Sequence, residues 1–89
     1  MTFSFKISSE LQKTLNGLAR KDKALAITVR KKVEQIVSCD ESSIKHYKNL
    51  KGTMSHLKRV HIRQFVLLFQ VSGNIIIFEK FCHHDEAYQ

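Results

Sequence analysis

A chain of 89 residues is long enough for one small domain with a single core, and an apolar fraction of 43% argues against intrinsic disorder. Fifteen Lys and Arg residues against eight Asp and Glu give a formal net charge of +7, which favours a polyanionic or acidic partner. No apolar run approaches the length of a membrane span. We expect neither a membrane anchor nor a secretory leader, which predicts a cytoplasmic protein.

The N-terminal residues predict a short strand that leads into a helix. Residues 3–7 alternate apolar and polar side chains, which is typical of a half-buried strand with Phe5 on its apolar face. Ser8 or Ser9 can then cap the helix by accepting a hydrogen bond from a backbone N–H of its first turn. Leu11, Leu15 and Leu18 follow at helical spacing, and we expect this helix to end near residues 19–21, where the chain turns polar.

A second helix is predicted directly after the first. Asp22 is a candidate N-cap, and apolar residues recur at alternating steps of three and four from Lys23 to about Ser38. Two helices so closely joined form an antiparallel hairpin. The polar residues 39–43 end the second helix, and residues 44–54 are expected to form a loop or a short turn.

Three strands are predicted after that loop. Residues 56–62 alternate, whereas residues 65–71 and 75–81 are largely apolar on both faces, which indicates strands in the middle of a sheet. Tight connections at residues 63–64 and 72–74 make these three strands an antiparallel meander.

The element order β-α-α-β-β-β predicts a single α/β (α+β) domain over residues 1–89. The first strand is expected to join the same small, mostly antiparallel sheet. The helical hairpin should cover one face of that sheet, which leaves the opposite face open.

Charge is unevenly distributed along the chain. No Asp or Glu occurs from Ser42 through Phe78. An acid-free basic stretch that feeds one sheet predicts a surface for a polyanion. The cationic and imidazole side chains of this stretch are Lys45, Lys48, Lys51, Lys58, Arg59 and Arg63 together with His46, His56 and His61.

A polar cluster follows the last buried strand and ends the chain. We expect the open face to collect Arg59 and His61 from one strand and His84 and Tyr88 from this tail. Histidine can act as acid or base near neutral pH, arginine can bind phosphate, and tyrosine can stack on a base. These side chains suit RNA cleavage by a neighbouring 2′-hydroxyl, although composition alone favours simple RNA binding.

Residues 82–85 read Cys-His-His-Asp, which resembles a set of zinc ligands. Consecutive residues cannot all converge on one ion, and no Cys-x-x-Cys is present, so we expect no metal site. Because successive strand side chains point to opposite faces, His83 should point away from the side that His84 faces. Cys39 and Cys82 have no disulfide spacing and are expected to be reduced.

Four short motifs, in order, resemble the RelE/ParE superfamily of toxins from type II toxin–antitoxin systems. Leu50-Lys51-Gly52 resembles the family's L-R-G, and Arg59-Val60-His61 resembles the R-x-R of the next strand. Phe65 to Phe69 resembles a Y-R motif followed by apolar residues, and the last motif is His84 to Tyr88. The resemblance covers essentially the whole chain, and the order and spacing of the motifs make it specific.

The resemblance implies a metal-independent endoribonuclease that needs no cofactor and cleaves messenger RNA in the ribosomal A site. Attack by the 2′-hydroxyl would leave a 2′,3′-cyclic phosphate. The implied partners are the ribosome with its messenger RNA and a RelB-like antitoxin, which is expected to be acidic. The alternative is a ParE-like inhibitor of gyrase, or a catalytically weak toxin relative that only binds nucleic acid or antitoxin.

The resemblance to the YafQ branch, which uses histidines, also implies roles for single residues. His84 resembles its general acid, Tyr88 its substrate-holding aromatic, and Arg59 with His61 a phosphate-binding and proton-transfer pair. Which histidine is acid and which is base stays open. Val66 departs from the family pattern, because RelE-type toxins have an arginine there. Further RNA contacts are expected from Lys48, Lys51, Lys58 and Arg63. For Lys58 and Arg63 the alternative is a solvated side chain with no role in binding.

Overall fold

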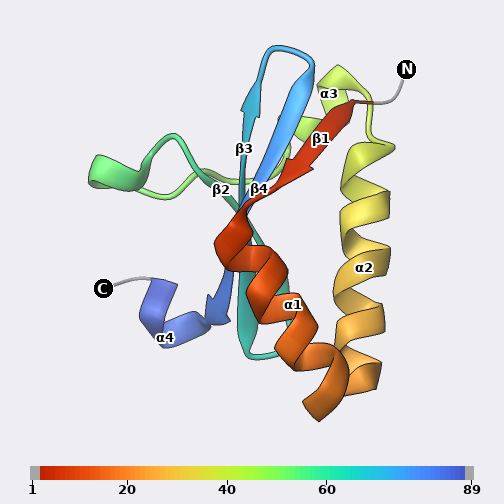
Figure 1. The fold of residues 1–89 in the computed structure, drawn as a ribbon. Helices are drawn as coiled ribbons and strands as arrows, with labels where there is room; N and C mark the ends of the chain where they lie inside the picture. Colours follow the sequence, from red (N-terminus) through yellow and green to blue (C-terminus); the bar gives the residue numbers. More distant parts are fainter. Residues whose placement is uncertain (1–2, 88–89) are drawn as a thin grey trace.

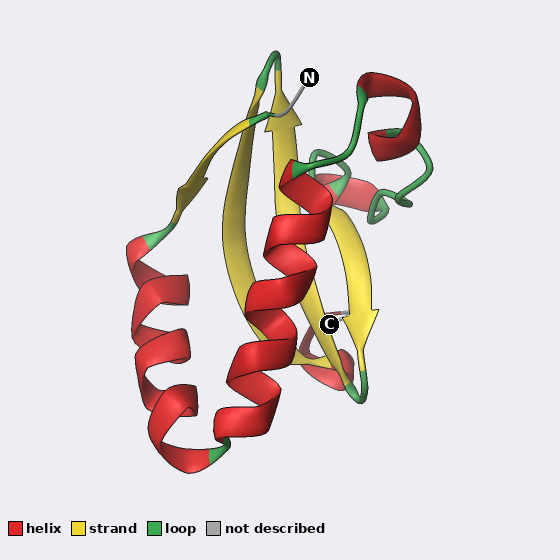
Figure 2. Cartoon of the chain, turned by 90° about the vertical axis from the view of Figure 1, so that its right-hand side faces the viewer, coloured by secondary structure: helices red, strands yellow, loops and turns green. Residues whose placement is uncertain are grey.

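In the computed structural model, which describes residues 3–87, a helical hairpin packs on one face of a four-stranded sheet, as predicted (Figures 1 and 2). None of the helices within this described range is long and apolar enough to span a membrane. The elements are β1 (Ser4–Ile7), α1 (Ser9–Lys21), α2 (Lys23–Val37), α3 (Glu41–Ile44), the 3₁₀ turn η1 (Gly52–Met54), β2 (Lys58–Ile62), β3 (Phe65–Ser72), β4 (Ile75–His83) and α4 (His84–Ala87).

The strands are ordered β1-β4-β3-β2 across the sheet. β3 and β4 are the two inner strands, which confirms what their apolar residues on both faces predict. β2, β3 and β4 form the predicted antiparallel meander, and β1 joins the sheet by pairing in parallel with β4.

Two side-chain caps fix where the helices begin. The Ser8 hydroxyl accepts a hydrogen bond from the Leu11 backbone N–H at 3.0 Å, so Ser8 rather than Ser9 is the N-cap of α1. The Asp22 carboxylate accepts from the Leu25 N–H at 3.1 Å and caps α2. Asp22 also ends α1, because its own N–H donates to the Leu18 carbonyl, and this one residue therefore makes the bend of the hairpin.

The main core lies between the hairpin and the sheet. Its largest side chains without solvent exposure include Leu11 from α1, Ile36 from α2, and Phe69 and Phe78 from the sheet. Burial of each such side chain stabilises the fold by roughly 1.5–3 kcal/mol. Within residues 3–87 no polar or charged side chain is buried, so the polar groups that could do chemistry all lie at or near the surface.

Phe5 differs from the expectation that it is covered. It shares the hairpin side of the sheet with its partner Ile76, yet 49% of its surface is exposed. β1 is an edge strand, and the Phe5 ring contacts the Phe78 ring edge-on with centroids 6.2 Å apart. Alternation predicts the face that a side chain takes, but not whether a helix reaches far enough to cover it.

Short helical turns occupy places where the sequence predicts only loop or tail. Asp40 caps α3, and the backbone hydrogen bond from Ser43 to its carboxylate, 2.8 Å long, holds the pKa of Asp40 below its usual value. The C-terminal polar cluster is not a simple strand exit, because His84 begins α4, which turns back onto the sheet.

Candidate functional site

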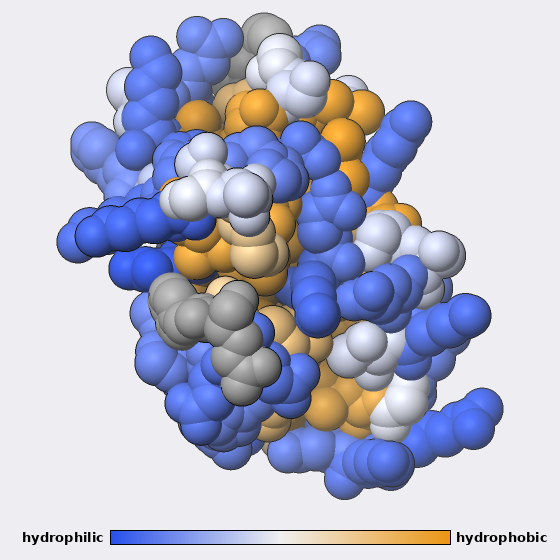
Figure 3. All heavy atoms as spheres, turned by 90° about the vertical axis from the view of Figure 1, so that its left-hand side faces the viewer, coloured by the Kyte–Doolittle hydropathy of each residue, from blue (hydrophilic) through white to orange (hydrophobic). Residues whose placement is uncertain are grey.

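The face of the sheet opposite the hairpin carries a second, smaller apolar cluster. It holds α4 and the loop of residues 45–57 against the sheet, and Figure 1 shows both on the side away from α1 and α2. Viewed from that side in Figure 3, apolar surface is visible between hydrophilic groups. The buried members of this open-face cluster are Leu50, Leu57, Val66, Leu68, Cys82 and Ala87.

β2 places Arg59 and His61 on the open face. They alternate with Val60 and Ile62, which pack into the hairpin-side core. Arg59 is half-buried and lies opposite Leu68 of β3, whereas His61 is exposed and lies opposite Val66. Arg59 and His61, which the sequence predicts to act together, are therefore separated by one residue on β2 and lie on the same face of the sheet.

α4 brings His84 beside His61. The two imidazole rings have centroids 5.4 Å apart and are tilted by 32°. The His84 backbone N–H donates to the Gln64 carbonyl at 2.9 Å, which fixes the start of α4 against the β2–β3 turn. The exposed Asp85 carboxylate lies 3.6 Å from Nδ1 of His84. His61 and His84 therefore meet on the face of the sheet that also carries Arg59.

His83 faces away from this group, as strand alternation predicts. Its ring contacts Phe65 edge-on at a centroid distance of 5.7 Å, and Phe65 in turn stacks on Phe81 of the hairpin-side core. Its Nδ1 accepts a hydrogen bond from the Asp85 backbone N–H at 3.3 Å. His83 therefore helps to end the strand.

Lys80 is an open-face cation that strand alternation does not predict. Leu68 pairs with Lys80 whereas Phe69 pairs with Phe78, so Glu79 is an extra residue in a β-bulge. Strict alternation from the buried Phe78 would send Lys80 into the core, and the bulge returns it to the face that carries Arg59. Arg59, Leu68 and Lys80 consequently form one row across three strands.

Lys48 and Lys51 are exposed in the loop on the open-face side. The Lys48 carbonyl accepts from the Arg59 N–H at 3.0 Å, and Lys51 precedes η1. This backbone bond ties the loop to β2 next to the candidate site.

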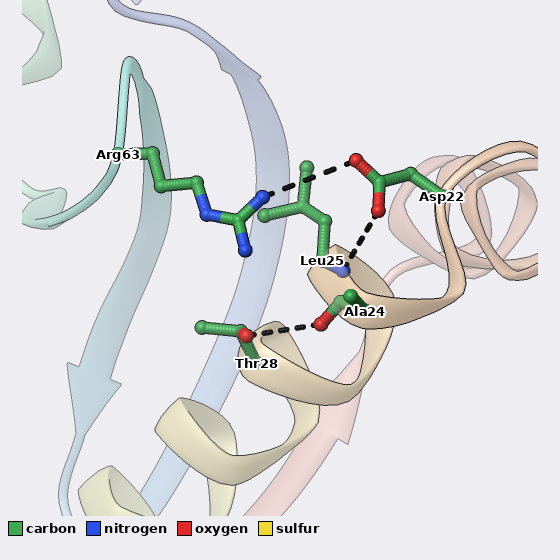
Figure 4. Close-up of polar contacts among 5 residues, drawn as sticks. All are labelled: Asp22, Ala24, Leu25, Thr28 and Arg63. Atoms are coloured by element: carbon green, nitrogen blue, oxygen red, sulfur yellow. Dashed lines mark hydrogen bonds and ion pairs between the residues drawn. The ribbon is translucent and has the colours of Figure 1, made fainter.

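Lys58 and Arg63 are not part of the open-face group. The Lys58 ammonium donates to the Tyr47 carbonyl at 3.1 Å and to Asn49 Oδ1 at 2.9 Å, which fastens the loop from the other side of β2. The Arg63 guanidinium extends toward Asp22 at the hairpin bend, 3.9 Å away (Figure 4). Tyr88, the remaining predicted site residue, lies outside the described residues.

Apolar side chains of the open-face cluster lie beneath the two imidazoles. Val66, at the position where RelE-type toxins have an arginine, has no exposed surface and lies between His61 on β2 and Cys82 on β4. Burial raises the pKa of the Cys82 thiol, which keeps it protonated and a poor nucleophile near neutral pH. Across residues 3–87 no three His, Cys, Asp or Glu side chains gather in a way that could hold a metal ion.

Sequence comparison identifies relatives along nearly the full chain, although no protein-family model matches it. The chain is 38% identical over 90 residues to a protein of Methanocaldococcus jannaschii named "Putative toxin RelE4", covering 98% of this chain and 92% of that protein. It is 37% identical over 89 residues to an uncharacterised protein of Methanosarcina mazei, covering 97% and 99%.

Solved structures share the fold at low sequence identity. YafQ of Escherichia coli superimposes with a TM-score of 0.65 at 12% identity, covering 98% of this chain and 99% of that one. A chain of the RelBE2 toxin–antitoxin complex of Mycobacterium tuberculosis superimposes with a TM-score of 0.64 at 10% identity, covering 93% and 99%. The full-length match to the M. jannaschii protein shows that the chain belongs to the RelE family of toxins of toxin–antitoxin systems.

Proposed function

We propose that this toxin is a metal-independent endoribonuclease that cleaves messenger RNA in the ribosomal A site. The observation that supports this most is the pairing of His61 with His84, ring centroids 5.4 Å apart, on the same sheet face as Arg59. Attack by a 2′-hydroxyl on its own phosphodiester requires a base, an acid and a cation, which are roles that two imidazoles and a guanidinium can fill.

In the proposed reaction one imidazole takes the proton of the 2′-hydroxyl while the oxygen attacks phosphorus. The other imidazole protonates the 5′-oxygen as its bond to phosphorus breaks, which leaves a 2′,3′-cyclic phosphate and a free 5′-hydroxyl. We assign the acid to His84, following the resemblance to the YafQ branch, and the base to His61. Arg59 stabilises the charge that builds on the phosphate oxygens, because Val66 supplies none. The proposed role of Tyr88 is to stack on the substrate base.

Cations around the histidine pair would hold the RNA backbone. Lys80 extends the Arg59 row across the sheet, and Lys48 and Lys51 stand on the neighbouring loop. Contacts of this kind position RNA without reading its sequence. Because so small a surface offers few groups that read bases, we propose that the ribosome presents the substrate.

An acidic antitoxin is the proposed protein partner. The chain carries a formal net charge of +7, and the solved structures that share its fold include the DinJ–YafQ toxin–antitoxin complex of E. coli. A RelB-like partner that covers the open face would shield Arg59, His61 and His84 together. Charge complementarity of this kind also accelerates association.

The substrate can be tested with purified ribosomes that carry a defined messenger RNA. We expect cleavage on the ribosome in the presence of the toxin, little cleavage of the same RNA alone, and products that end in a 2′,3′-cyclic phosphate. The buried Val66 favours one alternative, a toxin that binds its target without cleaving RNA. Intact RNA together with loss of gyrase supercoiling activity would replace the nuclease by a ParE-like inhibitor.

A further inference from the structure

The β2–β3 turn has an unusual backbone for the residues it contains. Only Arg63 and Gln64 connect Ile62 to Phe65, the last pair of the β2–β3 ladder. Arg63 has a φ of +58° and is the one non-glycine residue with positive φ within 3–87. A side chain in this left-handed region is disfavoured, and glycine is the residue usually found at such a position of a tight hairpin.

This turn contacts the candidate site through its backbone. The Gln64 carbonyl accepts the hydrogen bond from the His84 N–H at 2.9 Å, one residue beyond the last ladder pair, Phe65 with His83. That bond lies where β4 becomes α4, so it sets the direction in which His84 leaves the sheet. With α4 starting in this direction, the His84 ring lies 5.4 Å from the His61 ring, measured between centroids.

The side chain of Arg63 leaves the turn on the opposite side. Its guanidinium lies 3.9 Å from Asp22, and both side chains are about half exposed. Exposed ion pairs at this distance stabilise little, and Asp22 already caps α2 with its other oxygen. The contribution of position 63 to the site therefore comes from its backbone conformation.

We infer that the Arg63–Gln64 turn is a positioning element, which holds His84 beside His61 through the Gln64 carbonyl. This inference rests on the proposed nuclease function for its kinetic consequence, but the positioning itself can be measured without activity. It also gives Arg63 a conformational role in place of the expected RNA contact.

Substitutions at position 63 separate backbone conformation from charge. Arg63→Gly removes the cation but accepts positive φ readily, so His84 should keep its amide protection and cleavage should stay within about twofold. Arg63→Val introduces a β-branched side chain that resists positive φ, and we expect the His84 amide to exchange at least ~10-fold faster. The same shift of His84 should lower kcat at least ~10-fold with little change in KM, because it displaces a proton-transfer group.

The matched control is Gly73→Val, which imposes the same conflict at φ +60° in the β3–β4 turn. Figure 1 shows that turn at the far end of the sheet from α4. This control should slow cleavage and expose the His84 amide far less than Arg63→Val does. If Arg63→Val does not fold, inserting one glycine after Gln64 displaces the carbonyl in a longer loop and should give the same exchange and kinetic effects.

Two results would overturn the positioning role. In the first, Arg63→Val or the glycine insertion speeds exchange of the His84 amide no more than Gly73→Val does. In the second, Arg63→Gly loses cleavage while the His84 amide stays protected, which would mean that the Arg63 guanidinium binds RNA. A wild-type chain that cleaves no RNA would refute the proposed nuclease, whereas amide exchange and the His61–His84 ring contact by NMR would still decide the positioning.

Discussion

The imidazoles of His61 and His84 face each other at a centroid distance of 5.4 Å, one from an edge strand and one from the first turn of the C-terminal helix. His83, the neighbour of His84, packs on Phe65 instead. The pair therefore acts as one unit in the proposed reaction, and His83 provides an internal comparison.

If both rings transfer protons in one reaction, replacing either should remove most of the rate. We expect His61→Ala and His84→Ala each to lower kcat by about 100-fold or more, because general acid and base catalysis contributes that much. The double variant should be slower than the worse single variant by no more than about threefold, since the two groups serve one step. His83→Ala should cleave within a few-fold of wild type, and the measurement is single-turnover cleavage on programmed ribosomes. Equal losses in all three single variants would contradict the assignment.

Lys80 should contribute to binding and not to the chemical step. We expect Lys80→Ala to weaken the affinity for programmed ribosomes and to reduce the slope of log K against log salt by about 1, as for loss of one phosphate contact. The rate constant at saturation should change little. Lys13→Ala removes the same charge from the exposed face of α1 and should leave affinity and slope unchanged. If both variants behave alike, the row of Arg59 and Lys80 is not an RNA contact.

Lys58 should matter for stability, because its ammonium bonds Tyr47 and Asn49 of the loop. We expect Lys58→Met to lower the free energy of unfolding by about 1 kcal/mol, the usual net contribution of such partly exposed hydrogen bonds. Lys48→Met, at an exposed position, should change it by less than about 0.5 kcal/mol. Urea unfolding followed by circular dichroism measures both values. Equal stability of the two variants would mean that the Lys58 bonds contribute nothing.

Ser8 links two distant parts of the chain. Its hydroxyl caps α1 and also donates to the Glu79 carbonyl in the β-bulge at 2.6 Å. Ser8→Ala should therefore lower the free energy of unfolding by about 1–2 kcal/mol, the upper part of the range for a lost cap. Ser9→Ala should cost less than about 0.5 kcal/mol, because Ser9 is an exposed first residue of the helix. Thermal or urea unfolding of the two variants would show whether the order is reversed.

Much of the fold could be predicted from local patterns. The cap at Asp22, the amphipathic spacing of α2 and the doubly apolar strands β3 and β4 are properties of short segments, and the structure confirms them. The exposure of Phe5 could not be predicted, because it depends on how far the hairpin covers an edge strand.

The candidate site could be predicted only in part. Arg59 and His61 share a face through simple alternation, which a sequence shows directly. Lys80 joins them only because Glu79 bulges out of the ladder. The sequence marks this bulge only by placing the core residues Phe78 and Phe81 three positions apart, where strict alternation requires an even spacing. The Gln64 carbonyl is a backbone group, so no residue type signals its bond to His84.

Primer extension on messenger RNA from translating extracts tests the central claim most directly, with wild type beside His84→Ala. We predict new ends in phase with codons in the wild-type reaction and none above background with the variant. Translation that continues without new ends would contradict the nuclease. Cleavage that survives in His84→Ala would contradict the role of His84 as the acid and assign it to another group.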